Sequence, residues 1–293
     1  MRSSNRAYLT VTPDLTNDTP VYTNDYPGSI GVSEATFEHV DAPTTAIFSL
    51  ASVGLAAVVW LWWPRRASPR GGAIGDLESL LLRHVAFYAA LSGEARRRFA
   101  ARIRDFLSTV RVSGAGCDVT DLDRVLVAAS AQMLLHGTDE YRYPGLREVL
   151  LHPTHFGEDG APGDPDEDML GLVGEELLSS TVVLSREDLH AGFAPGADLH
   201  VGLHEFAHWL DRLDGAADGV PEHYLPAGAA LRWRRVIDAE LQRVRMGRGW
   251  LDPYAAEDAA ELFAVATEHY FLWPRELRGA HGELYGLLRG LYG

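Results

Sequence analysis

Lysine is absent from this chain of 293 residues, so all 26 basic residues are arginine, against 41 aspartates and glutamates. The formal net charge of −15 argues against nucleic acid as a direct partner, because binding to phosphates requires a basic face. Cysteine is nearly absent as well. The single Cys117 can form no disulfide within the chain, which is typical of a folded domain in a reducing compartment.

Long apolar runs are scarce, and only residues 46–63 form one. This uncharged run of about 18 residues reaches the lower limit for a helix that spans a bilayer. Three tryptophans close to its end would lie in an interfacial belt, and Arg65 and Arg66 follow directly. We therefore predict a single transmembrane helix in the cytoplasmic membrane, with the chain after it facing the cytoplasm. Because the length is marginal, a buried core helix is the alternative.

Composition divides the rest of the chain. Residues 1–44 are rich in Thr, Asp, Pro, Ser and Asn without an apolar period, which predicts a disordered tail. Residues 67–75 resemble a linker of Gly, Pro and Arg. We expect one folded domain over residues 76–293, whose hydrophobic residues suffice for a sizeable core.

Within this domain, the apolar spacing predicts helices more often than strands. Thr120 and Asp123 form a capping-box pattern ahead of one helix, and Gly137 is expected to end it. Strands are predicted at Arg147–Leu151 and Thr181–Leu184. The fold class is therefore α+β, mostly helical with a small sheet. The predicted helices are 76–90, 94–110, 125–135, 199–214, 226–246, 258–271 and a short one at the C-terminus.

The helix over 199–214 contains the pattern His204-Glu205-Phe206-Ala207-His208. Histidines four residues apart lie about 40° apart around a helix axis, so both imidazoles can bind one metal ion. Glu205, next to the first histidine, can act as a general base without binding the metal. This pattern predicts a catalytic Zn²⁺ site of a peptidase. A purely structural zinc is disfavoured, since such sites are usually rich in cysteine.

A catalytic zinc site usually has three protein ligands, so one more residue is needed. Candidates are the glutamates of the later helix, Glu257, Glu261 and Glu268. The last two are seven residues apart and therefore share a helix face. Glu261 also forms a capping-box pattern with Asp258, so the residue pattern alone leaves all three candidates open.

Several motifs together resemble the Mlc titration factor A family of zinc peptidases, which is related in its catalytic core to anthrax lethal factor. The resemblance covers roughly residues 76–290. The motifs that carry it are His204–Asp211, Asp214–Gly219, Asp252–Tyr254, Ala260–Val265, Tyr143–Arg147 and Val182–Ser185.

The resemblance implies a zincin-like metallopeptidase domain with one Zn²⁺ per chain, held by His204, His208 and Glu261. It also implies that Tyr254 contributes to catalysis and that the substrate is a peptide or protein. The family's Asn-Pro ahead of the ligand glutamate is replaced here by Asp258-Ala259. The family further suggests an alternative function, a regulatory protein that binds and sequesters a transcriptional repressor, with peptidase activity secondary.

Two further roles are expected from the residues themselves. Asp211 lies seven residues after His204 on the same helix face and can orient a ligand histidine, with a role on the helix surface or in capping as the alternative. The strand Thr181–Leu184 can pair with an extended substrate. By contrast, His200 lies outside the register of the two ligand histidines, and the role of Glu268 stays ambiguous.

Overall fold

The structure is a computed structural model that describes residues 65–67, 74–154, 171–173 and 180–293. The predicted tail 1–44 and the predicted transmembrane helix 46–63 lie outside the described residues. Among the helices that are described, none combines the length and the apolar character that crossing a bilayer requires. The predicted linker 67–75 begins inside the fold, because Ala67 is the last residue of the first strand.

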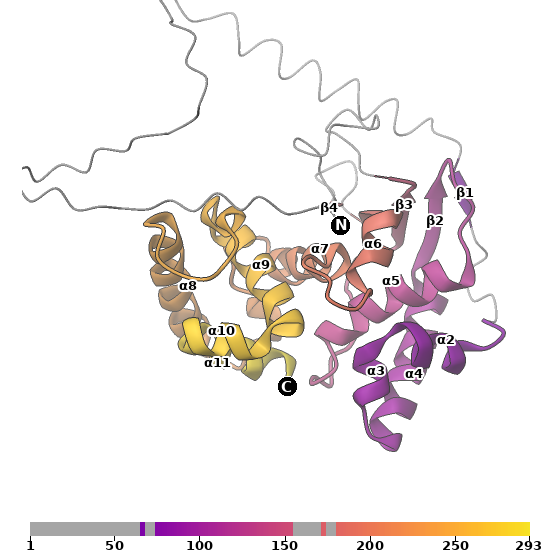
Figure 1. The fold of residues 1–293 in the computed structure, drawn as a ribbon, viewed down its shortest axis with the longest axis horizontal. Helices are drawn as coiled ribbons and strands as arrows, with labels where there is room; N and C mark the ends of the chain where they lie inside the picture. Colours follow the sequence, from indigo (N-terminus) through magenta and orange to yellow (C-terminus); the bar gives the residue numbers. More distant parts are fainter. Residues whose placement is uncertain (1–64, 68–73, 155–170, 174–179) are drawn as a thin grey trace, which may run out of the picture. The chain divides into compact units, whose positions relative to one another are not determined.

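The described residues form a five-stranded sheet with the strand order β1-β2-β3-β5-β4. Figure 1 labels β1, β2, β3 and β4. The three central strands of the sheet are parallel, and β1 and β4 flank them as antiparallel edge strands. The strands are β1 (Arg65–Ala67), β2 (Arg111–Ala115), β3 (Glu148–His152), β4 (Gly171–Val173) and β5 (Thr181–Ser185).

The predicted strands at 147–151 and 181–184 are confirmed as β3 and β5. Every residue of β5 is buried, as expected for a parallel strand covered on both faces. β1, β2 and β4 were not predicted. β1 and β4 have three residues each, too few for a recognisable alternation. β2 has five residues, but it contains Gly114, and glycine is depleted in strands.

Three helices precede β2 in the chain, and one follows it. Those before it are α2 (Leu77–His84), α3 (Ala86–Ala90) and α4 (Gly93–Thr109), and the one after it is α5 (Asp121–Leu134). The single helix predicted over 76–90 is wrong, because Val85 is extended, with φ −119° and ψ 92°. Val85 is only 1% exposed, so the break places its side chain in the core.

Two predictions about α5 had different outcomes. The capping box of Thr120 and Asp123 is confirmed. Gly137, however, does not end the helix, which stops at Leu134. A Cβ atom at Gly137 would lie 2.5 Å from the carbonyl oxygen of Tyr292, so glycine is required there for the close approach of the C-terminal helix.

The remaining chain is almost entirely helical. Its central element is α7, which packs against α5, α6, α9 and β5. The α+β class with a small sheet is confirmed for the described residues. These elements are α6 (Arg186–Gly192), α7 (Val201–Asp211), η1 (Arg212–Asp214), η2 (Glu222–Tyr224), α8 (Ala230–Arg245), η3 (Pro253–Ala256), α9 (Ala259–Leu272), α10 (Pro274–Ala280) and α11 (Gly282–Tyr292).

Candidate metal centre

Helix α7 presents one buried face to the core and one face to α9. Leu203, Phe206 and Leu210 are fully buried, and they fix the rotation of the helix. At its start, the Nδ1 atom of His200 accepts a hydrogen bond from the backbone N–H of Leu203 at 3.3 Å. Gly215, with φ 93°, follows the short helix η1 that extends α7.

His204 and His208 point to the same side of α7, as their spacing predicts. Their Nε2 atoms lie 3.1 Å apart, and their side chains are 12% and 17% exposed. Two imidazole nitrogens that face each other this closely, and that remain partly open to solvent, are arranged to share one ligand.

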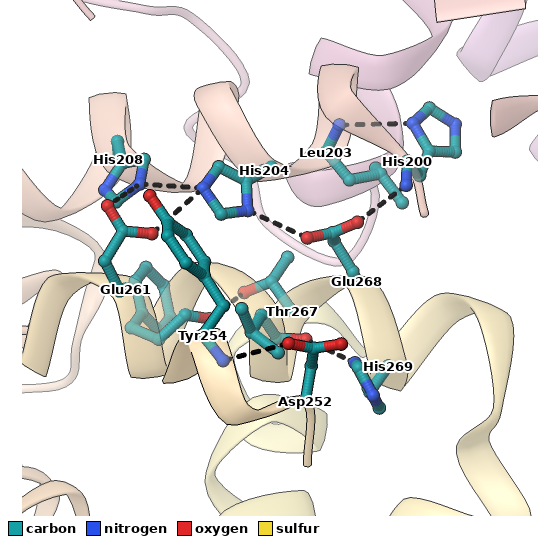
Figure 2. Close-up of polar contacts among 12 residues, drawn as sticks. His200, Leu203, His204, His208, Asp252, Tyr254, Glu261, Thr267, Glu268 and His269 are labelled. Atoms are coloured by element: carbon teal, nitrogen blue, oxygen red, sulfur yellow. Dashed lines mark hydrogen bonds and ion pairs between the residues drawn. The ribbon is translucent and has the colours of Figure 1, made fainter. Parts of the chain in front are cut away.

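Helix α9 brings Glu261 to these two nitrogens (Figure 2). Its carboxylate oxygens lie 3.1 Å from His204 Nε2 and 3.3 Å from His208 Nε2. The ligand atoms of the three residues all lie within 4.8 Å of one another, the only such group found among the described residues. Two imidazoles and one carboxylate form the donor set of catalytic zinc sites, so the residues present fit this metal.

The capping function predicted for Asp258 does not compete with this arrangement. Asp258 accepts a hydrogen bond from the backbone N–H of Glu261 at 2.9 Å and thereby caps α9. Because only the backbone of Glu261 takes part in this bond, its carboxylate is left to face the histidines.

The other two candidate ligands lie elsewhere. Glu257 is exposed, at the end of η3, and is absent from the convergent group. Glu268 lies on the opposite side of the His204 ring, where its Oε1 atom is 2.8 Å from Nδ1. It therefore contacts the nitrogen that faces away from Glu261.

The charges of this cluster perturb one another strongly. Burial opposes ionisation of Glu261, but hydrogen bonds from His204 and His208 outweigh it and lower the pKa of Glu261 to about 2. Burial likewise opposes protonation of His204, yet Glu261 and Glu268 hold its pKa well above the usual value. Zinc binding needs the neutral form of a histidine ligand, so the affinity for zinc is expected to depend on pH.

Glu205 and Tyr254 are the two predicted catalytic residues, and both interact electrostatically with Glu261. Glu205 is 5% exposed, and burial raises its pKa even though His204 and His208 counteract this. The ring of Tyr254 lies 6.2 Å from the ring of His204, and its hydroxyl points toward the cluster in Figure 2. Burial raises the pKa of Tyr254, and the charges of Glu261 and Glu257 raise it further. The hydroxyl of Tyr254 therefore keeps its proton.

The role predicted for Asp211 is wrong. Its Oδ2 atom accepts a hydrogen bond from the backbone N–H of Gly219 at 2.9 Å, so the carboxylate fixes a loop instead of a ligand histidine. Gly219 in turn lies against the start of α9, where an added Cβ would be 2.3 Å from the carbonyl oxygen of Ala259. Asp211 thus helps to hold α9 next to α7.

His200, which was not expected at the site, and Glu268, whose predicted role was ambiguous, both lie there. His200 caps α7, and Glu268 contacts both His204 and the backbone of His200. The seven-residue spacing between Glu261 and Glu268 was the available signal, because it places both on one face of α9.

Comparisons with known proteins relate the chain to a family of metallopeptidases. A model of the glucose-regulated metallo-peptidase M90 family matches residues 60–293. An uncharacterized protein of Synechocystis sp. is 30% identical over 266 residues, which cover 85% of this chain and 96% of that protein. Mlc titration factor A of Klebsiella pneumoniae is 31% identical over 231 residues, 72% of this chain and 83% of the relative. Mlc titration factor A of Escherichia coli is 34% identical over 146 residues, 44% of this chain and 52% of the relative.

Proposed function

The chain belongs to the glucose-regulated metallo-peptidase M90 family, that of the Mlc titration factor A proteins, and on this premise we propose that it is a zinc peptidase. The observation that supports this most directly is the convergence of His204, His208 and Glu261 within 4.8 Å. These three residues would hold one Zn²⁺ per chain. The relation of the catalytic core to that of anthrax lethal factor stays a prediction.

The chain's own residues divide the chemistry between them. A bound Zn²⁺ would supply Lewis acidity at the scissile carbonyl and a more acidic water. Glu205 accepts the proton of the attacking water and passes it to the leaving amine. Burial raises the pKa of Glu205 and so moves it toward the neutral range, where a general base is most effective. The Tyr254 hydroxyl donates a hydrogen bond to the negative charge that develops on the carbonyl oxygen.

The substrate strand is expected at β4 and not at β5. Both edges of β5 are occupied, by β3 and by β4, so the predicted pairing of an extended peptide with β5 is wrong. β4 ends the sheet within the part of the chain that the structure describes, and it packs against α7. We propose that an extended peptide adds to the free edge of β4, which would align it beside the catalytic helix.

A peptide-library assay tests the proposed activity. The zinc-loaded full chain is expected to cleave peptide bonds, and a chelator is expected to abolish the cleavage. A zinc-loaded chain that cleaves no member of a diverse library, although its fold is intact, would contradict the proposal.

Replacing Tyr254 by phenylalanine should lower the rate roughly 10²-fold and leave the zinc content unchanged. The phenol is not among the convergent ligand atoms, so its loss removes a hydrogen-bond donor to the transition state and no metal ligand. Steady-state kinetics together with metal analysis measure both quantities. A full rate, or a loss of zinc, would show that Tyr254 has another role.

The name of the relatives, Mlc titration factor A, supports a second candidate function. The second candidate, which the family resemblance implies, is a protein that binds and sequesters a transcriptional repressor, with hydrolysis secondary. Binding of a regulator and cleavage of a peptide differ in their need for the general base, so a variant of Glu205 separates the two functions.

We also propose that residues 46–63 anchor the chain in the cytoplasmic membrane, with the catalytic domain facing the cytoplasm. The apolar run and the arginines after it support this. Since β1 begins at Arg65, only Pro64 would separate the anchor from the sheet.

Fractionation tests the anchor: the full chain should stay with the membranes until detergent is added. A matched variant, Leu55→Arg with Val58→Arg, should be soluble, because each central arginine costs roughly 2.5–3.5 kcal/mol of insertion free energy. Recovery of the unmodified chain without detergent would refute the anchor.

Protease protection in spheroplasts tests the orientation. Protease added outside should leave the catalytic domain intact. If the protease digests this domain while cytoplasmic marker proteins survive, the orientation is the reverse of the one proposed.

A further inference from the structure

Glu268 is a buried carboxylate that bonds to α7 at two points (Figure 2). It is 2% exposed and extends from α9, two helical turns after Glu261. Its Oε1 atom lies 2.8 Å from Nδ1 of His204, and its Oε2 atom accepts a hydrogen bond from the backbone N–H of His200 at 2.6 Å. Both oxygens of one side chain thus bind the helix that carries the metal-facing histidines.

The contact with His204 determines which nitrogen is free to bind a metal. A carboxylate accepts hydrogen bonds, so the ring nitrogen facing Glu268 must carry the hydrogen. With this hydrogen on Nδ1, the Nε2 atom of the neutral ring, which lies 3.1 Å from both Glu261 and His208, would keep its lone pair for a metal. The carboxylate also holds the ring plane, because its other oxygen is fixed to the backbone of His200.

The contact with His200 satisfies a second requirement. A helix start leaves backbone N–H groups without partners in the helix, and it favours a negative charge nearby. Glu268 supplies both a hydrogen-bond acceptor and a negative charge at the N-cap of α7. The side chain of His200 in turn accepts a hydrogen bond from the backbone N–H of Leu203. The start of α7 and the His204 ring are therefore positioned by the same carboxylate.

We infer that Glu268 is a positioning residue of the metal centre: it fixes the tautomer and orientation of His204 and holds α7 in register with Glu261 on α9. This inference rests on the proposed function, because it assumes that His204 binds zinc through Nε2. Outer partners of this kind contribute roughly 10–100-fold to metal affinity.

The test compares the zinc affinity of the full chain with those of Glu268→Gln and Glu257→Gln by competition with a chromophoric chelator. Glu268→Gln preserves the size of the side chain, but an amide has one acceptor oxygen and cannot accept hydrogen bonds from both His204 and the backbone of His200. The zinc affinity of this variant should therefore fall roughly 10–100-fold. Glu257→Gln, an exposed change just ahead of α9, should keep the affinity of the unmodified chain. The absorption spectrum of the Co²⁺-substituted protein should shift in Glu268→Gln alone, which a merely structural role would not produce.

A measurement on the unmodified chain covers the case in which Glu268→Gln does not fold. A long-range ¹H–¹⁵N spectrum of the zinc-bound protein should show His204 protonated at Nδ1. Protonation at Nε2, or equal zinc affinities for the three folded proteins, would overturn the inference. If the unmodified chain binds zinc but cleaves no peptide, the proposed function alone fails, and the affinities still decide the role of Glu268.

Discussion

Glu205→Gln should lower kcat/KM for peptide hydrolysis by roughly 10²–10⁴-fold while the protein keeps its zinc. The reason is the division of roles in α7. Glu205 is buried next to both histidines, yet it is not one of the three residues whose ligand atoms converge. The change removes a base and preserves the size of the side chain, so neither the metal nor the packing of α7 should be lost.

The measurement combines steady-state kinetics with metal analysis of the same preparation. Glu187→Gln, an exposed glutamate in the first turn of α6, serves as the matched control and should keep full activity. Loss of zinc in Glu205→Gln would assign this residue to the metal, and full activity would remove it from the mechanism.

The same variant separates the two candidate functions in cells. If a cellular effect of the protein disappears with Glu205→Gln, that effect depends on hydrolysis. If it persists while the purified variant is inactive, sequestration of a regulator accounts for it, and peptidase activity is secondary.

Glu261→Ala should weaken zinc binding far more than Glu257→Ala, and by more than the roughly 100-fold upper limit expected for a residue that only orients a ligand. The carboxylate of Glu261 is 3.1 Å and 3.3 Å from the two Nε2 atoms, whereas Glu257 is exposed at the end of η3. Removing Glu261 therefore deletes one of three ligands and leaves two imidazoles, too few for a stable catalytic site.

The measurement compares the zinc affinities and melting curves of four full-length proteins, which are the unmodified chain, Glu261→Ala, Glu257→Ala and Glu268→Ala. The opposite ranking, in which Glu268→Ala strips the metal and Glu261→Ala does not, would show that α9 presents a different glutamate to the histidines than the structure indicates.

The local part of this site was predictable from the sequence. His204 and His208 share a face because of the helical period alone, and the buried Leu203, Phe206 and Leu210 on the other faces favour a helix there. The strand β5 was also predictable from its local sequence, because Thr181, Val182 and Val183 are β-branched residues, which favour strands.

The non-local part was not predictable from the residue pattern. Three glutamates around α9 had equal claims, and the choice of Glu261 depends on how α9 packs on α7. That packing involves the contact of Gly219 with Ala259, which no spacing rule reveals. Likewise, β5 has a strand on either side only because the short strand β4 follows it in the sheet. His200 was set aside because it lies outside the register of the two ligand histidines, and its role as the N-cap of α7 depends on its contact with Glu268 of α9.

The central claim is that one zinc ion, held by His204, His208 and Glu261, makes this chain a peptidase. Its most direct test is a titration of the metal-free full chain with Zn²⁺ while peptide hydrolysis is followed. We expect no hydrolysis without metal and a rise that saturates at about one equivalent per chain, as for a single three-ligand site. Hydrolysis that persists in the metal-free chain, or that zinc does not restore, would contradict the claim.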